Sequence, residues 1–315
     1  MENSRILTSS EVPLLLLGFN RLDLLKKRIL EISRMPVKIL YLSIDGGGNV
    51  STEELDKFLS WSKNHLLHLT EFVVELKTEN LGLVNHITAA ISEVLSQYSH
   101  VVIVEDDIEM ANGFFENIIY GFNQQLESKS RGIVGGFSVL NLQGNRLGKN
   151  YWRESDYISI WGWGCTSEIW EHYNKNLDYN SCIRQLRESK NWNKLTIFQR
   201  SVWLGRFRKV ISNPDRTWDI QLQYLSFAED LKNIYPIFSF VRNEGFDSSR
   251  SSNTKGKKPF WMSNNLPSKS YITSRCNSKL INHILRRLDS NLLAGDTRLI
   301  FYWKHKLKLR LPFRH

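Results

Sequence analysis

The sequence predicts an α/β fold in which a mostly parallel sheet is covered by helices on both faces. In the first 110 residues, short apolar runs alternate with amphipathic stretches of helical spacing, an alternation typical of strand–helix–strand units. The apolar runs are nearly continuous instead of alternating with polar residues, which indicates strands buried on both faces. Both observations favour parallel strands joined by covering helices.

The expected elements of this first half follow one another in regular order. Buried strands are expected at residues 12–18, 38–44, 72–76 and 101–104, and helices at residues 22–33, from residue 51 onward, and at residues 82–98. The middle helix opens with Ser51-Thr52-Glu53-Glu54, a Ser followed three positions later by a Glu, which is typical of a helix N-terminus.

After residue 130 the pattern becomes less regular. Further strands are expected at residues 132–139 and 235–240, a charged helical stretch at 180–209, and polar loops at 141–150 and 243–258. We expect a main domain over residues 1–270, made of the halves 1–130 and 131–270, and a basic helical extension over residues 271–315.

Length and cysteine content narrow the class of protein. A chain of 315 residues can bury a large core and typically forms one or two domains. Cys165, Cys182 and Cys276 are widely spaced and form no Cys-x-x-Cys pair, which argues against a zinc site and a disulfide framework. The apolar run at residues 12–17 is too short for a signal peptide core or a membrane span. We therefore expect a cytoplasmic protein.

Positive charge is concentrated near the C-terminus. Of the formal net charge of +10, residues 275–315 carry +8, because this segment contains ten Lys and Arg residues and only two Asp and Glu residues. The tail is expected either to lie on the anionic inner face of a membrane or to pack on the rest of the protein. No nucleic-acid partner is expected, since no recognition motif accompanies the charge. Apolar residues mark one face of the tail: Ile281, Ile284, Leu285, Leu288 and Leu292.

Polar residues follow each of the four strands expected in the first half. In open parallel sheets, ligands bind at the carboxyl ends of the strands, beside the point where the strand order reverses. The sequence therefore predicts a binding site at this edge of the sheet. The polar groups, in strand order, are Asn20-Arg21, Asp45, Asn80 and Glu105-Asp106-Asp107.

The three consecutive acids after the fourth strand are the strongest local signal. Three carboxylates repel one another unless a cation or hydrogen-bond donors neutralise them. Such hard oxygen ligands suit Mg²⁺ or Mn²⁺, which can bridge to the phosphates of a nucleotide. The alternative is a solvated acidic turn that caps a helix expected at residues 111–122.

The segment Glu105-Asp106-Asp107-Ile108-Glu109-Met110-Ala111, with Phe114-Phe115 after it, resembles the N-acetylglucosaminyltransferase I family and a group of bacterial GT-A glycosyltransferases. The resemblance implies a GT-A fold and a nucleotide diphosphate sugar as donor, with a UDP-sugar favoured. It implies that Asp107 binds Mn²⁺ or Mg²⁺, that Asp106 lies at the metal and the donor, and that Glu105 contacts the donor.

Further segments resemble these enzymes in the same order over residues 13–250. They imply donor contacts from Phe19, Asn20 and Arg21 in the first loop, from Asp45 to uracil or its equivalent, and from Asn80 and Gly82 before a helix. The segments are Pro13–Arg21, Ser43-Ile44-Asp45-Gly46, Asn80-Leu81-Gly82, Ile160-Trp161-Gly162-Trp163-Gly164, Thr217-Trp218-Asp219-Ile220-Gln221 and Asn243-Glu244-Gly245-Phe246.

The tryptophan segment has two interpretations, because Trp161 and Trp163 can form a platform for a sugar or pack against the sheet. Trp163 is counted among the donor-site residues. The sequence departs from the bacterial enzymes after residue 246, where Arg250 stands near the position of a His. Arg250 either replaces that His as a fixed cation or lies in a solvated loop.

The resemblance implies that Asp219 is the general base of an inverting transfer, in which a carboxylate must lie within hydrogen-bond reach of the acceptor hydroxyl. The alternative is that Asp219 caps a helix at residues 220–231. The implied activity is transfer of a hexose or N-acetylhexosamine to a glycan or lipid-linked acceptor. Two alternatives remain: a non-catalytic carbohydrate- or nucleotide-binding module, and a sugar-phosphate nucleotidyltransferase. The latter needs a Gly-rich first loop, and this chain has one glycine there, Gly18.

Overall fold

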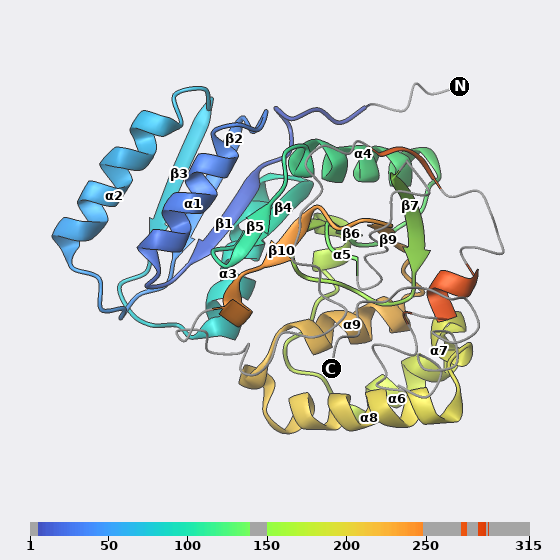
Figure 1. Ribbon diagram of the computed structural model, residues 1–315. Helices are drawn as coiled ribbons and strands as arrows, with labels where there is room; N and C mark the ends of the chain where they lie inside the picture. The colour runs from blue at the N-terminus through green and yellow to red at the C-terminus, as the bar shows by residue number, and fades with distance from the viewer. Residues whose placement is uncertain (1–5, 139–149, 248–271, 276–282, 288, 290–315) are drawn as a thin grey trace, which may run out of the picture.

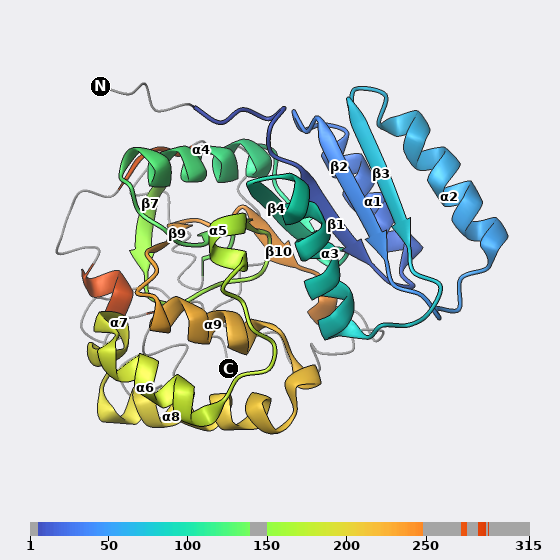
Figure 2. The ribbon, with the colours of Figure 1, turned by 180° about the vertical axis from the view of Figure 1, so that it is seen from behind.

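The computed structural model describes residues 6–138, 150–247, 272–275, 283–287 and 289. Within them, most strands belong to one nine-stranded sheet of order β11-β7-β9-β6-β8-β4-β1-β2-β3 (Figure 1). Most neighbouring strands in it run parallel, and helices cover both faces (Figures 1 and 2). The predicted α/β class is confirmed.

The first half of the chain forms the regular part of the sheet. Side chains of its strands alternate between two core clusters, as the period of two in a strand requires: Leu14 and Leu16 pack with α1 and α2, whereas Leu15 and Leu17 pack with α3. The elements are β1 (Leu14–Gly18), α1 (Leu22–Ile32), β2 (Ile39–Ile44), α2 (Thr52–His65), β3 (Glu71–Leu76), α3 (Leu83–Gln97) and β4 (His100–Glu105).

These elements match the predicted ones to within a few residues. The expected N-terminus of the second helix is also confirmed, because the Ser51 hydroxyl accepts from the Glu54 amide at 3.2 Å while the Glu54 carboxylate accepts from the Ser51 amide at 3.0 Å. This reciprocal pair satisfies two backbone donors at the start of α2.

The second half completes the sheet and adds a helical lobe of α6, α7, α8 and α9, which has its own core cluster. The elements are β5 (Ile108–Met110), α4 (Phe114–Glu127), β6 (Val134–Gly135), β7 (Asn150–Ser155), β8 (Trp163–Thr166), α5 (Ser167–Trp170), α6 (Tyr179–Glu188), α7 (Lys190–Asn193), α8 (Ile197–Ser212), η1 (Pro214–Arg216), α9 (Asp219–Ala228), β9 (Asn233–Pro236), β10 (Val241–Asn243), η2 (Gly245–Asp247) and β11 (Ile272–Arg275).

Two predictions for the second half are wrong in detail. The expected helical stretch at residues 180–209 is three helices, because Ser189 and Thr196 adopt extended backbone and cap α7 and α8 with their hydroxyls. The expected strand at 235–240 is also divided. β9 ends at Pro236 in the large sheet, and the chain then crosses to pair β10 with β5. The strand expected at 132–139 is shorter, and the loop expected at 141–150 lies largely outside the described residues.

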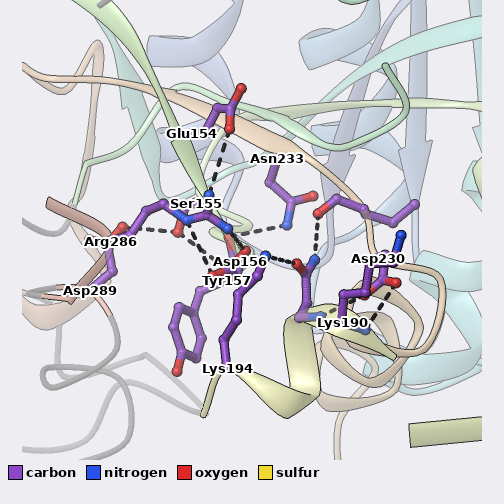
Figure 3. Close-up of polar contacts among 12 residues, drawn as sticks. Glu154, Ser155, Asp156, Tyr157, Lys190, Lys194, Asp230, Asn233, Arg286 and Asp289 are labelled. Atoms are coloured by element: carbon purple, nitrogen blue, oxygen red, sulfur yellow. Dashed lines mark hydrogen bonds and ion pairs between the residues drawn. The ribbon is translucent and has the colours of Figure 1, made fainter. Parts of the chain in front are cut away.

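The described part of the C-terminal region packs on the body of the protein. β11 pairs with β7 at the edge of the large sheet, and residues 283–287 form a helical turn. From this turn, Arg286 donates to Asp156, with its Nε at 3.3 Å (Figure 3). The carboxylate of Asp289 accepts from Arg153. It also accepts from the Ser155 hydroxyl at 2.9 Å (Figure 3).

These contacts favour the packed interpretation for this part of the tail, and the division at residue 270 stays a prediction. Of its expected apolar face, Leu285 is buried and Ile284 half-buried, whereas Ile281, Leu288 and Leu292 lie outside the described residues. No helix in the described ranges has the length and apolar character needed to cross a membrane.

Candidate active site at the reversal of strand order

The order of the sheet reverses beside β1. From β1 the chain adds β2 and then β3 on one side, and then crosses to place β4 on the other side of β1, with all four strands parallel. The loops after β1 and β4 therefore meet at the carboxyl ends of two adjacent parallel strands, the position at which ligands bind in such sheets. Arg21 follows β1 and the three acids follow β4, so the predicted groups meet at this position.

Arg21 is the counter-charge of the acids. Its Nε donates to Oδ2 of Asp106 at 3.0 Å, and its Nη2 donates to the other oxygen, Oδ1, of the same carboxylate. Its contact with Oδ2 of Asp107 is longer, at 3.4 Å. Arg21 thus forms a two-point pair with Asp106, the geometry that a guanidinium favours, and leaves Asp107 less engaged.

Burial makes the acid cluster costly to ionise. Burial raises the pKa of Glu105 to about 8, and the charges of Asp107, Asp106 and Asp219 add to this shift. Burial also raises the pKa of Asp106 to about 6 against the opposing effect of Arg21, and it raises that of Asp107. One guanidinium therefore does not neutralise the cluster, and a further cation would stabilise it.

A second cation, Arg28, lies within electrostatic range of Asp106 and Asp107, and the sequence analysis did not identify it. It is 1% exposed and donates to Glu31 at 2.7 Å and to Glu244 at 3.1 Å. Its charge lowers the pKa of Asp106, against the effect of burial. Arg28 occupies the apolar stripe of α1 between Leu25 and Ile29, and a charged residue at such a position is the signal that could have identified it.

The segment Asn243-Glu244-Gly245-Phe246 lies directly beside the acids. β10 pairs antiparallel with β5, so that Asn243 is opposite Ile108. The Glu244 amide donates to the backbone carbonyl of Asp107 at 2.7 Å, and the Asn243 side chain accepts from the Gly245 amide at 2.7 Å. The structure therefore brings together two of the segments that carry the resemblance.

The loops after β2 and β3 are tied together by Asp45. Its Oδ1 accepts from the amides of Gly46 at 3.0 Å and Leu81 at 2.9 Å, and its Oδ2 accepts from Gly82 at 3.2 Å. The Asn80 side chain also accepts from Gly82, at 2.8 Å. Gly82 has a φ of +75°, a conformation that favours glycine. Asp45 thus connects the two loops through hydrogen bonds to their amides. Its contact with a nucleobase stays a prediction.

The loop after β1 lies against the loop after β2. A Cβ added to Gly48 would lie 3.1 Å from the Cβ of Asn20 and 3.6 Å from the ring of Phe19. The predicted donor residues Phe19, Asn20, Asp45, Asn80 and Gly82 therefore occupy adjoining loops at one edge of the sheet. Their contacts with a donor remain predictions.

Asp219 reaches the same region from the second half of the chain. It is half-buried at the first position of α9, after Trp218, and its side chain caps no backbone amide of that helix. Its Oδ1 instead accepts from the Thr217 hydroxyl. Its charge raises the pKa of Glu105 and that of Tyr173, which places it within electrostatic range of the acid cluster.

Buried aromatic rings hold this position of Asp219. The indole of Trp163 stacks on that of Trp218, with ring centroids 5.5 Å apart and planes inclined by 21°. The Tyr173 hydroxyl donates to the Trp218 carbonyl at 3.1 Å. Because Trp163 is 1% exposed, its ring belongs to the core, which favours the packing interpretation, and its contact with a donor stays a prediction. Trp161 is half-buried and packs against Phe137 instead.

Arg206 is another residue that sequence reasoning missed, and no pattern in the sequence identifies it. Its guanidinium lies over the ring of Trp203 at 4.3 Å from the centroid. Burial lowers the pKa of Arg206, and the charge of Asp219 opposes this effect. A cation on α8 therefore lies within electrostatic range of Asp219.

The described residues contain no group of three or more His, Cys, Asp or Glu side chains arranged to hold a metal. A Mg²⁺ or Mn²⁺ ion that binds a nucleotide typically takes only one or two carboxylates and completes its octahedron with phosphate oxygens and water. Asp107 fits such an ion as its single direct protein ligand. Asp106 is paired with Arg21 at both oxygens and fits a direct ligand less well than predicted.

No known protein family matches the chain, and no curated protein matches it. Several solved structures are similar to it. The mannosyltransferase PcManGT from Pyrobaculum calidifontis, in complex with GDP-Man and Mn²⁺, shares 12% identity over 70% of this chain and 68% of its own, with a TM-score of 0.41. TarS residues 1–349 from S. aureus share 9% sequence identity over 51% of this chain and 48% of their own length, with a TM-score of 0.37. A UDP-glucose pyrophosphorylase in complex with UDP-glucose shares 9% sequence identity over 72% of this chain and 90% of its own, with a TM-score of 0.36. At these scores the likeness assigns neither a substrate nor a reaction to this chain.

Proposed function

We propose that this chain is a metal-dependent glycosyltransferase of the GT-A type. It moves a sugar from a nucleotide diphosphate donor to a hydroxyl of a glycan or a lipid-linked acceptor. One observation carries the proposal: the acids that end β4 lie at the reversal of strand order, within electrostatic range of Asp219 from the other half of the chain. A site that transfers a sugar needs these two groups on opposite sides of one crevice.

On the donor side, Asp107 holds Mg²⁺ or Mn²⁺ and the loops after β1, β2 and β3 hold the nucleotide. The bound ion supplies neutralisation of the charge that builds on the departing diphosphate. Arg21 keeps Asp106 ionised and fixed beside Asp107. Asp45 keeps the loops after β2 and β3 together, so that Asn80 and Gly82 are presented to the donor.

On the acceptor side, Asp219 is the general base. It accepts the proton of the acceptor hydroxyl while the hydroxyl oxygen attacks the anomeric carbon from the face opposite the diphosphate. This single displacement inverts the configuration of the sugar. The stacked rings of Trp163 and Trp218 hold Asp219 in place, and the Thr217 hydroxyl orients its carboxylate.

The resemblance at the sequence level favours a UDP-sugar as donor and a hexose or N-acetylhexosamine as the transferred group. A sugar-phosphate nucleotidyltransferase is the weaker alternative. Such an enzyme would use the loop after β1 to cradle a triphosphate, whereas here the cation of that loop, Arg21, is engaged with Asp106.

The general-base role is tested with Asp219→Asn. Release of nucleoside diphosphate from a panel of nucleotide sugars with Mn²⁺ should depend on acceptor and fall on the order of 10²-fold or more in this variant. Binding of UDP with Mn²⁺, measured by calorimetry, should be nearly unchanged. Asp215→Asn is the matched control, because Asp215 lies four positions earlier, is exposed and pairs only with Lys175 among the described residues.

Wild-type turnover by Asp219→Asn would remove this residue from the mechanism. Absence of any UDP or GDP binding in the presence of Mn²⁺ would remove the nucleotide site itself. Nucleotide-sugar binding with no transfer to any glycan or lipid-linked acceptor would favour a carbohydrate- or nucleotide-binding module instead.

A further inference from the structure

A cavity of about 620 Å³ opens between α6, α7 and α8. Figure 2 shows these three helices gathered in the helical lobe, on the side of the molecule away from α1 and α2. None of the residues that line the cavity belongs to the candidate active site. The cavity is therefore separate from the candidate active site.

Three arginines line this cavity: Arg184 and Arg187 from α6 and Arg200 from α8. Its lining contains no Asp or Glu, and within the described residues none of the three guanidinium groups forms an ion pair with a carboxylate. Arg200 is held by the carbonyls of Trp192 and Asn193, at 3.2 and 2.7 Å. Asp178, just before α6, lies within electrostatic range of Arg184. Three arginines against this one acid still favour an anion, and a phosphate suits the planar guanidinium groups.

The remainder of the cavity wall is apolar. Ile183 and Leu204 are half-buried there, and Trp192, 5% exposed, lies at the base. A small inorganic anion would leave these groups without a partner. The combination favours a ligand in which an anionic group is joined to a hydrocarbon part.

The start of α8 exposes large apolar side chains close to this cavity. Ile197 is 86% exposed and Phe198 is 44% exposed. Ile197, Arg200 and Leu204 follow the spacing i, i+3, i+7, which places them on one face of the helix. One face of α8 therefore presents an exposed isoleucine in line with an arginine and a leucine that line the cavity, a pattern suited to the boundary between head groups and acyl chains.

We propose that this cavity binds the phosphate head group of an anionic membrane lipid, and that Ile197 enters the adjoining apolar layer. The surface made of Arg184, Arg187, Arg200 and Ile197 then docks the protein on the membrane. This inference is independent of the proposed transfer reaction, and it assigns membrane contact to the helical lobe instead of to residues 275–315.

The test is cosedimentation of the full chain with phosphatidylcholine vesicles that contain or lack phosphatidylglycerol. Binding should require the anionic lipid and weaken with salt. Each arginine near an anionic surface contributes on the order of 1 kcal/mol, so Arg184→Gln with Arg187→Gln should weaken binding by more than tenfold. The matched control, Arg34→Gln with Lys63→Gln, removes the same charge from exposed positions at α1 and α2 and should bind as the wild type does.

A second variant distinguishes the contribution of apolar contact with the lipid from the contribution of charge. Ile197→Ser leaves the charge unchanged and should still weaken binding to the anionic vesicles severalfold, because the exposed side chain no longer enters the apolar layer. Both sets of substitutions lie on exposed positions, and unchanged melting temperatures would show that the fold is intact.

Equal vesicle binding by the arginine variant and its control would overturn the proposal, and it would assign membrane contact elsewhere, for example to residues 275–315. Equal binding to neutral and anionic vesicles would also overturn it. If sn-glycerol 3-phosphate binds in calorimetry and the arginine variant abolishes this binding while no vesicle is bound, the ligand is a soluble phosphate and the lipid assignment is wrong.

Discussion

Replacement of Arg21 by methionine tests whether one guanidinium holds the acid cluster in place. The substitution keeps a long, unbranched side chain but removes both donors to Asp106. It also removes the charge that lies 3.4 Å from Asp107. The variant should fold less stably in the absence of divalent cations, because the buried acids then lose the counter-charge that contacts them directly and only the more distant Arg28 remains.

The expected loss of folding stability follows from the burial of Arg21 and Asp106. The side chains of Arg21 and Asp106 are 17% and 4% exposed, so little water screens the charge that remains. Removal of one partner of a buried ion pair costs about 3–5 kcal/mol. Since 1 kcal/mol shifts the melting temperature of a chain somewhat smaller than this one by about 2–4 °C, we expect a fall of roughly 5–15 °C.

The same variant should respond more strongly to Mn²⁺ than the wild type does. In the wild type Arg21 occupies both oxygens of Asp106, whereas in Arg21→Met both are free to join Asp107 in binding the ion. An ion that binds only the native state raises its stability in proportion to the logarithm of its concentration. Thermal unfolding with and without Mn²⁺, in the absence of nucleotide, measures both effects.

Arg34→Met is the control, because Arg34 is exposed just after α1; it should keep the wild-type melting temperature in both conditions. If Arg21→Met also melts at the wild-type temperature without metal, the guanidinium does not stabilise the cluster. If Mn²⁺ shifts the wild type and the variant equally, Asp106 is not a latent metal ligand.

Three further predictions concern stability, each read from denaturant unfolding. Asp289→Ala should cost about 3–5 kcal/mol, because it leaves Arg153 buried without its partner; a negligible loss would show that the C-terminal turn is not docked. Gly205→Ala should add about 0.5–1 kcal/mol, since a Cβ at this position in α8 meets open space; a loss would contradict this. Burial lowers the pKa of His100 from 6.5 to about 4, so the unfolded chain takes up a proton first as the pH falls. His100 should therefore remove about 3 kcal/mol of stability between pH 6.5 and 4, and this contribution should appear as the difference between the pH profiles of the wild type and His100→Gln.

The first half of the fold was predictable because its signals are local. Near-continuous apolar runs such as Leu14–Gly18 and His100–Glu105 are long enough to be recognised as buried strands. The second half was harder to predict, because β5 and β10 are three residues each. Such short strands show no periodicity, and their pairing depends on contacts between distant segments.

The position of the site was predictable, whereas its internal contacts were not. Parallel strands present their carboxyl ends at one edge, so the loops that contain Arg21 and Asp107 had to converge. The pairing of Arg21 with Asp106 instead of Asp107 depends on side-chain geometry that no spacing reveals. The burial of Trp163 was likewise open, because a tryptophan suits a sugar platform and a core equally well.

The stack of Trp163 on Trp218 has a consequence for how this kind of protein can diversify. Trp163 belongs to β8, which pairs with β4 so that Ile103 faces Trp163, and β4 ends in the acids. Asp219 and Glu105 are thus attached to the same rigid framework, one through stacked indoles and the other through the strand itself. Surrounding loops can vary and alter which molecules are accepted, while the spacing between these two carboxylates stays unchanged.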